Sequence, residues 1–209
     1  MSPNWPLVLA SASPARLSTL RSAGVRPLVQ VSAVDEAALL ASAGVTDPEK
    51  VPLLLAKAKA EDVAAGLGME AIVLGCDSVL VLDGVALGKP ADASDAVQRW
   101  KQMRGRSGSL RTGHWLIDLR SAESGGSQGS VGATSVTTVH FADLSDDEIA
   151  AYVATGEPLQ VAGAFTVDGL GGAFITKIEG DFHGVVGVSL PLLRDLLGSL
   201  GVPWTALWA

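Results

Sequence analysis

The sequence predicts an α/β (or α+β) protein in which a mixed β-sheet is flanked by helices. Two observations support this class: short apolar runs typical of buried strands alternate with segments of helical periodicity, and no repeat of solenoid length occurs. The chain has 209 residues, of which 48% are hydrophobic and 18% charged. This composition favours a folded protein with one sizeable core, so we expect one domain over residues 1–209, or two small lobes.

The first half of the chain is expected to begin with a buried strand and a capped helix. Pro6–Ala10 is a short apolar run, Ser13 is a suitable N-cap before Pro14, and Gly24 ends the helical segment. The next expected elements are a strand over Pro27–Ala33, a helix over Asp47–Ala65, a strand over Ala71–Leu82 that can bend at Gly75, and a hairpin over Val81–Leu87 that turns at Asp83-Gly84.

The second half is interpreted from the same signals. Ser145 and Glu148 stand at capping-box spacing before a helix that ends near Gly156. Residues 121–133 are rich in Gly and Ser and are expected to form a flexible hairpin loop. The other expected elements are a helix over Ser94–Arg104, strands over Leu110–Arg120 and Thr134–Leu144, a glycine-rich β-like segment over Gly163–Ile178, and a closing helix over Leu190–Leu200.

Charge and cysteine content exclude several functional classes. The net charge of −7 disfavours a broad surface for nucleic acid or anionic lipid. No apolar run approaches the roughly 20 residues that a membrane span needs, and the N-terminus does not resemble a signal peptide. The single cysteine, Cys76, excludes an internal disulfide and suits a reducing compartment. We therefore expect a cytoplasmic protein that binds neither nucleic acid nor a membrane.

Asp77 is a carboxylate inside the most apolar strand of the chain. A charged group in a dry strand is costly unless a metal, a cation or several donors compensate it. The alternative is that Asp77 ends the strand and caps a neighbouring turn. Ligands of open α/β sheets usually bind at strand ends, so both interpretations keep Asp77 as a candidate site residue.

Arg16 and Lys59 are cations at unusual positions. Arg16 falls in the first turn of a helix, where a cation opposes the helix dipole unless an anion binds there. Lys59 lies four residues after Leu55 and four before Val63, and therefore within an apolar stripe. The alternatives are an exposed Arg16 with nothing bound and a Lys59 that reaches water along its own methylenes.

Together these residues suggest a polyphosphate site. Three cations (Arg16, Lys59 and Lys89) and two carboxylates (Glu36 and Asp77) fall near predicted element ends or on an inward face. Lysine and arginine neutralise phosphate oxygens, while carboxylates hold Mg²⁺. Their convergence in one site is a hypothesis at this point.

The chain contains five motifs whose order and spacing resemble those of one family, the Maf family of nucleoside triphosphate pyrophosphatases. They are LASASPAR (Leu9–Arg16), VDE (Val34–Glu36), LAKAKA (Leu55–Ala60), GCDS…DG…LGKP (Gly75–Pro90) and GEPLQVAGAFTVDGLGG (Gly156–Gly172). The resemblance implies an elongated mixed sheet in two lobes with a central cleft, and usually a homodimer. It also implies hydrolysis of a nucleoside triphosphate between its α and β phosphates.

The resemblance also implies roles for individual residues. Asp77 matches the general base, which activates water either directly or through a divalent metal, Mg²⁺ or Mn²⁺, that it shares with Glu36. The catalytic cations that bind the triphosphate are Arg16, Lys59 and Lys89. Ser11 and Ser13 are expected to help the backbone N–H groups that cradle phosphate oxygens.

Three substrate-binding positions depart from the family pattern. Members that act on UTP and dTTP carry arginine, threonine and glutamine where this chain has Ala15, Ser78 and Asp168. A branch that acts on a methylated guanosine triphosphate carries a bulky aromatic residue at the first position, which Ala15 does not match. An ionised Asp168 accepts hydrogen bonds but cannot donate them as glutamine does. A pyrimidine or modified nucleoside triphosphate is the expected substrate.

Two alternative functions make different demands on these residues. A nucleotide-binding regulator of septum formation or cell division would bind nucleotide without turnover, and it could lack Glu36 or Asp77. An RNA-binding module is disfavoured because the chain is acidic and has no platform of aromatic and basic residues.

Overall fold

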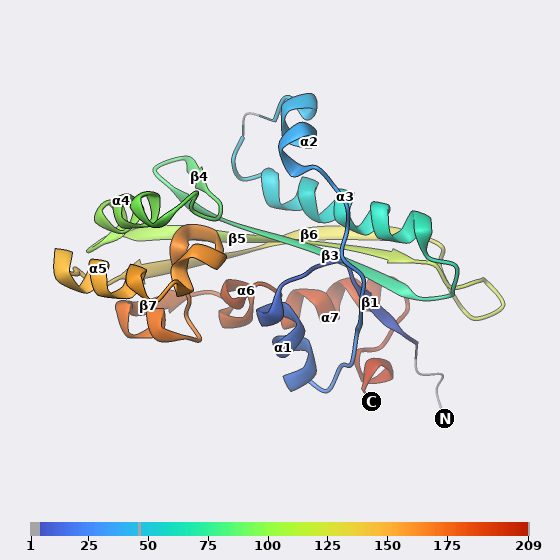
Figure 1. Ribbon diagram of the computed structural model, residues 1–209. Coiled ribbons are helices and arrows are strands. Elements are labelled where there is room, and N and C mark those ends of the chain that lie inside the picture. The colour runs from blue at the N-terminus through green and yellow to red at the C-terminus, as the bar shows by residue number, and fades with distance from the viewer. Residues whose placement is uncertain (1–4, 46, 209) are drawn as a thin grey trace.

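The computed structural model describes residues 5–45 and 47–208, and its centre is a seven-stranded mixed sheet (Figure 1). The strand order is β2-β1-β3-β5-β6-β7, and β4 pairs with the end of β3. Strands β2, β1 and β3 are parallel, whereas β3, β5, β6 and β7 form an antiparallel ladder. The strands are β1 (Leu7–Leu9), β2 (Leu28–Val29), β3 (Ile72–Leu82), β4 (Val85–Leu87), β5 (Ser107–Asp118), β6 (Ser130–Phe141) and β7 (Ile175–Glu179).

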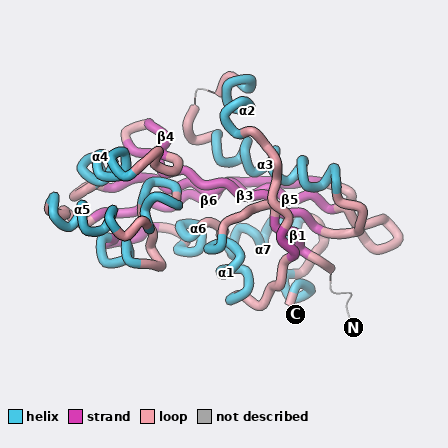
Figure 2. The backbone as a smooth tube through the Cα atoms, viewed as in Figure 1, coloured by secondary structure: helices cyan, strands magenta, loops and turns pink. Residues whose placement is uncertain are grey.

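Helices cover both faces of this sheet. Figures 1 and 2 show α3 along one face and α1, α6 and α7 on the opposite face. The helices are α1 (Pro14–Ser22), α2 (Glu36–Ala43), α3 (Val51–Gly66), α4 (Ala93–Met103), α5 (Asp146–Ala154), α6 (Phe182–Val186) and α7 (Leu190–Ser199). Short 3₁₀ turns lie at Glu157–Gln160, Ala162–Ala164, Leu170–Phe174 and Trp204–Leu207. The mixed α/β class predicted from the sequence is confirmed.

The apolar residues form separate core clusters on the two faces and at one end of the sheet. Alternate residues of β1 point to opposite faces, so Leu7 and Leu9 pack with α7, while Val8 packs with Val63 of α3. A third cluster surrounds Trp100 of α4 at the far end of the β5–β6 ladder. The Trp100 indole Nε1 donates to the Ala164 carbonyl at 2.8 Å, which satisfies its one buried donor.

Two glycines allow α3 to lie very close to the sheet. A Cβ built on Gly75 of β3 would overlap the Ala56 carbonyl oxygen, and one built on Gly113 of β5 would overlap the Pro52 carbonyl oxygen. Both glycines lie on the face that α3 covers, and Gly113 pairs directly with Asp77. The close approach therefore brings the side chains of α3 within reach of Asp77.

Several predicted elements are correct. Helices α1, α4 and α7 form where expected, and the capping box of Ser145 and Glu148 begins α5. Asp83 and Gly84 both have positive φ (51° and 77°), which is the geometry of a tight hairpin turn between β3 and β4. Strand β3 is continuous through Gly75 and does not bend into two pieces.

Other predicted boundaries are wrong. The strand over Pro27–Ala33 is reduced to Leu28–Val29. The helix over Asp47–Ala65, whose start Pro48 and Pro52 leave open by one turn, begins at Val51, because Pro52 fits only the first helical turn. The segment Gly163–Ile178 forms 3₁₀ turns before β7 rather than a strand, and Gly163 takes a φ of 70° that breaks extended structure. Strand β6 begins at Ser130, so residues 130–133 of the expected loop belong to the sheet.

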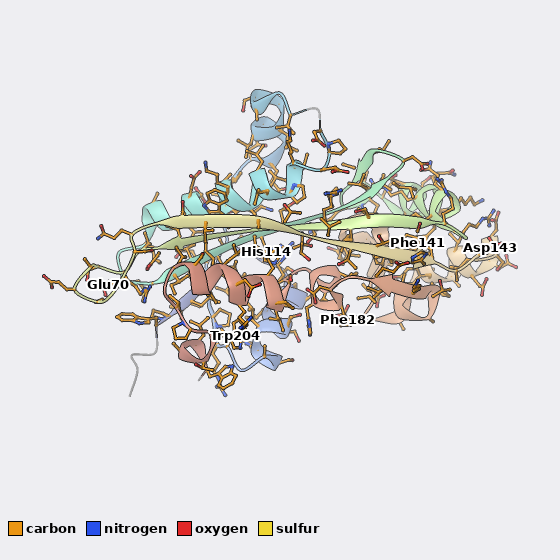
Figure 3. All side chains as sticks on the ribbon, turned by 180° about the vertical axis from the view of Figure 1, so that it is seen from behind. Glu70, His114, Phe141, Asp143, Phe182 and Trp204 are labelled. Carbon is orange, nitrogen blue, oxygen red and sulfur yellow. The ribbon has the colours of Figure 1, made fainter. Side chains whose placement is uncertain are left out.

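His114 is a buried histidine that connects β5 to α7 (Figure 3). Its Nε2 accepts the Ser189 backbone N–H at 2.8 Å, so its Nδ1–H donates to the Thr112 carbonyl at 2.9 Å. Burial lowers the pKa of His114 to about 4 from 6.5. The folded protein therefore holds this ring neutral.

Acidification is expected to weaken the fold through His114. Because its folded pKa is depressed, the stabilisation is complete above the unfolded pKa of 6.5 and is lost as the pH falls from there toward about 4. The free energy of unfolding from urea titrations should fall by about 2 kcal/mol between pH 7 and pH 5 through this group alone. His114→Gln should lose that part of the pH dependence, and an unchanged pH dependence in the variant would refute the assignment.

Candidate active site

The middle of β3 presents an open edge. Strand β5 pairs with one edge of β3 from Ile72 to Val81, so β1 and β4 share the other edge. On that edge β1 pairs only as far as Leu74, and β4 pairs only from Leu80 onward. In the described ranges, residues 75–79 thus have no strand on this side. The opening lies at the carboxyl end of β1, the kind of position at which α/β sheets bind ligands.

Lys59, Asp77 and Glu36 meet at this opening. The Lys59 Nζ lies 2.6 Å from Asp77 Oδ1 and 2.7 Å from Glu36 Oε1. The Lys59 and Asp77 side chains are 12% and 14% exposed, whereas Glu36 is 49% exposed. Asp77 lies in mid-strand rather than at a strand end, and the alternative that it caps a turn is wrong. The inward direction that the apolar stripe predicted for Lys59 is confirmed.

Helix α2 positions Glu36, and no sequence pattern predicted this helix. Glu36 is its first residue, and the Asp35 side chain accepts the Ala38 backbone N–H at 3.0 Å as the N-cap. Asp35 was therefore a usable signal, although the segment that follows it is short and apolar without clear periodicity. The cap fixes the direction in which the first turn of α2 points Glu36.

Burial raises the pKa of the Asp77 carboxyl above its ordinary value. The positive charges of Lys59 and Arg16 act in the opposite direction and offset only part of this effect. Asp77 therefore holds a proton more strongly than an exposed aspartate does, which suits a group that must take a proton from water.

Arg16 approaches the same opening from the other face of the sheet. Its guanidinium donates to the Gly187 carbonyl at 2.8 Å, to Ser11 Oγ at 3.0 Å and to Ser78 Oγ at 3.0 Å. Its backbone N–H is capped by the Ser13 hydroxyl. The alternative of an exposed and unengaged Arg16 is wrong.

Thr112 extends this network, and no sequence pattern indicated this residue. The Thr112 hydroxyl donates to the Gly184 carbonyl at 2.8 Å, so it can only accept from Ser78 Oγ, 2.9 Å away. The Ser78 hydroxyl in turn accepts from Arg16 and donates to Thr112. The donor and the acceptor of each hydrogen bond from Arg16 to the Gly184 carbonyl are therefore determined. Thr112 is opposite Ser78 only because of the β3–β5 register, which is a long-range property.

The structure places Lys89 beside the opening but not in the ion-pair cluster. Lys89 is exposed in a bend just after β4, whose pairing ends at Leu80. Arg99 of α4 donates to the Gly88 carbonyl at 2.6 Å, and Asp95 accepts the Ala91 backbone N–H at 2.9 Å. The backbone on both sides of Lys89 is thereby held while its side chain stays in solvent.

Asp168 and Ala15 are the remaining predicted residues. Ala15 lies in the first turn of α1, beside Arg16. Asp168 is exposed in the loop that precedes the 3₁₀ turn Leu170–Phe174. Glu157 holds this loop by accepting from the Tyr152 hydroxyl and from the backbone N–H groups of Leu170 and Gly171, at 2.9–3.0 Å. The described contacts do not join Asp168 to the cluster around Lys59.

The two carboxylates fit a divalent metal only in part. Glu36 and Asp77 converge on one point, which the Lys59 ammonium occupies. Among residues 5–45 and 47–208, no group of three or more histidine, cysteine, aspartate or glutamate side chains could hold a metal. Mg²⁺ commonly binds one or two carboxylates and completes its shell with phosphate oxygens and water. The pair therefore suits a metal that arrives with a phosphorylated ligand.

Cys76 is buried, and burial raises the pKa of its thiol to about 12, so it is not an ionised nucleophile at neutral pH. In the part of the chain that the structure describes, no helix has the length and hydropathy that a membrane span requires.

Comparison with known proteins identifies the family. The family model described as "Maf-like protein" matches residues 6–200. A protein from Streptomyces coelicolor named nucleoside triphosphate pyrophosphatase is 56% identical over 99% of this chain and 96% of its own length. Proteins of the same name from Salinispora tropica and Mycobacterium marinum are 55% and 50% identical over 97% of this chain, and over 87% and 96% of their own lengths.

One solved structure is distantly similar. It is a nucleoside-triphosphatase, or dITP/XTP pyrophosphatase, from Mycobacterium abscessus, at 15% identity and a TM-score of 0.40, covering 66% of this chain and 75% of its own. A likeness at this level carries no argument. The family match and the high identities show that the chain belongs to the Maf-like protein family.

Proposed function

We propose that this chain hydrolyses a nucleoside triphosphate between the α and β phosphates and releases the nucleoside monophosphate and pyrophosphate. The observation that carries the proposal is the cluster of Asp77, Glu36 and Lys59 at the open edge of β3, with Arg16 reaching the same edge from the opposite face. The names of the relatives agree with this reaction. The cations Lys59 and Arg16 can neutralise the anionic phosphates, and the Asp77 carboxylate can accept a proton from the attacking water.

In this proposal Asp77 accepts a proton from water while the water oxygen attacks the α phosphorus. The bond from the α phosphorus to the bridging oxygen then breaks, and the electron pair leaves with pyrophosphate. A metal held by Glu36 and Asp77, Mg²⁺ or Mn²⁺, would supply charge neutralisation for the phosphates. Arg16, Lys59 and Lys89 would stabilise the charge that develops on the leaving group.

The same proposal divides the opening into two sides. Successive residues of a strand point to opposite faces, so Asp77 faces α3 and Ser78 faces Arg16 and α1. The phosphates would lie along the open edge of β3, between Asp77 on one face and Arg16 on the other. The nucleobase would lie toward Ala15, Ser78 and Asp168. Ser11 and Ser13 would line the phosphate path at the start of α1. A homodimer and a cytoplasmic location stay predictions.

This function is tested by measuring pyrophosphate release from a panel of canonical, methylated and oxidised nucleoside triphosphates. The same measurement identifies the preferred nucleobase. We expect turnover of a pyrimidine or modified nucleotide, dependent on Mg²⁺ or Mn²⁺. Ala15→Arg, Ser78→Thr and Asp168→Gln together should move the preference toward UTP and dTTP. Thermal stabilisation by nucleotides without any turnover would instead favour the non-catalytic regulator of septum formation or cell division.

A further inference from the structure

Arg111 is a cation on the same face of the sheet as Asp77, one strand away on β5. On β5 it pairs with Val79 of β3, whereas Gly113, two residues further on, pairs with Asp77. Residues two apart on a strand share a face, so Arg111 and Asp77 are diagonal neighbours on the face that α3 covers. The first turn of α3 lies over Gly113, and Arg111 lies just beyond the start of that helix.

The hydrogen bonds of Arg111 are incomplete along one edge of its guanidinium. Its Nη2 pairs with Glu49 Oε1 at 2.7 Å, and its side chain is 18% exposed. Its Nε is buried and has no hydrogen-bond partner among the described residues. Nε and Nη2 form one of the two parallel-donor edges of arginine, so Glu49 fills half of an edge that binds two oxygens.

A phosphate group completes this edge better than Glu49 does. Phosphate offers several oxygens to the parallel donors of Nε and Nη2. Glu49 is 52% exposed and stands in the turn before α3, so its carboxylate can return to water when it is displaced. By contrast, the buried Nε–H has no acceptor among the residues that the structure describes while Glu49 alone is bound, and this is unfavourable.

The face on which Arg111 lies indicates which part of a nucleotide it meets. It shares the face of Asp77 and Lys59, whereas Ser78 and Arg16 lie on the other face. Lys59 already pairs with Glu36 and Asp77, so a leaving pyrophosphate on this face would need a further cation beside Lys59, and Arg111 can supply it.

We propose that Arg111 is a substrate-binding residue that contacts the β and γ phosphates, and that Glu49 occupies its donor edge until they bind. This inference rests on the proposed function, because it assigns a further contact to the same site. It predicts opposite effects for the two members of one ion pair. Removing Arg111 weakens the binding of pyrophosphate, whereas removing the charge of Glu49 removes a competitor.

Isothermal titration of the full chain with pyrophosphate, and separately with a nucleoside monophosphate, both in Mg²⁺, tests the inference. We expect Arg111→Met to weaken pyrophosphate binding by about tenfold or more and to leave monophosphate binding unchanged. Glu49→Gln, the matched control, should bind pyrophosphate as tightly as the wild type or more tightly. If Arg111→Met does not fold, Arg111→Lys keeps a charge for Glu49 but lacks the two-donor edge, and it should also bind more weakly.

Three results would overturn the inference. Equal weakening by Arg111→Met and Glu49→Gln would mean that the ion pair only holds the start of α3. Unchanged pyrophosphate affinity in Arg111→Met, or a loss confined to the monophosphate, would also contradict it. Failure of the proposed function is a separate result, since a wild-type chain that binds pyrophosphate in this manner but produces none from any triphosphate refutes only the function.

Discussion

Asp77→Asn is expected to lower kcat by about 10²–10⁴-fold without lowering the thermal stability of the fold. Asparagine keeps the shape of the side chain but cannot accept the proton of the attacking water. Burial raises the pKa of Asp77 despite Lys59 and Arg16, so the folded chain binds this proton more tightly than the unfolded chain. The ionised carboxylate therefore costs stability at neutral pH, and its removal should leave the unfolding temperature unchanged or higher.

Asp83→Asn is the matched control for this variant. Asp83 is exposed in the β3–β4 turn and pairs with Arg106 at the surface, so its removal should leave kcat nearly unchanged. The pH profile gives a second readout, because kcat/KM of the wild type should fall on acidification at a higher pH than an exposed aspartate would cause. Unimpaired turnover in Asp77→Asn would remove Asp77 from the mechanism.

Gly75→Ala is expected to destabilise the protein by at least about 3 kcal/mol, measured by urea unfolding. The new Cβ would overlap the Ala56 carbonyl, which belongs to the backbone of α3 and cannot move aside like a flexible side chain. Relief requires α3 to move away from β3. Because α3 carries Lys59, the same movement should separate Lys59 from Asp77 and reduce activity in any folded fraction.

Gly66→Ala provides the control in the same helix. Gly66 ends α3, and a Cβ there meets nothing within 4 Å. Alanine should therefore be neutral or stabilise the protein by up to about 1 kcal/mol, through its higher helix propensity. Equal stability of Gly75→Ala and Gly66→Ala would show that the close packing of α3 is not required.

Local signals predicted the elements that have strong caps and periodicity. The capping box of α5, the Asp83-Gly84 turn and the apolar stripe around Lys59 each depend on a few neighbouring residues, and each was predicted correctly. The segment Gly163–Ile178 was misread because a short apolar, glycine-rich run has no periodicity that separates a strand from 3₁₀ turns. Helix α2 was missed for a similar reason, since it is short and lacks a polar face.

The candidate site was predictable in its charged residues but not in their supports. Asp77 and Lys59 can be identified from the sequence because they are charged residues among apolar ones, and the family motifs indicated Glu36 and Arg16. Arg111 and Thr112 do not, because ordinary polar residues on a strand become site residues only through the β3–β5 register. Register depends on contacts between distant segments, which local sequence patterns do not encode.

The phosphorus products of the reaction show which phosphate bond is cleaved. A preferred nucleoside triphosphate from the panel is incubated with the chain and Mg²⁺, and the mixture is followed by ³¹P NMR. We expect nucleoside monophosphate and pyrophosphate to appear together in equal amounts, and Asp77→Asn to form neither at a comparable rate. Nucleoside diphosphate and orthophosphate as the first products would contradict it.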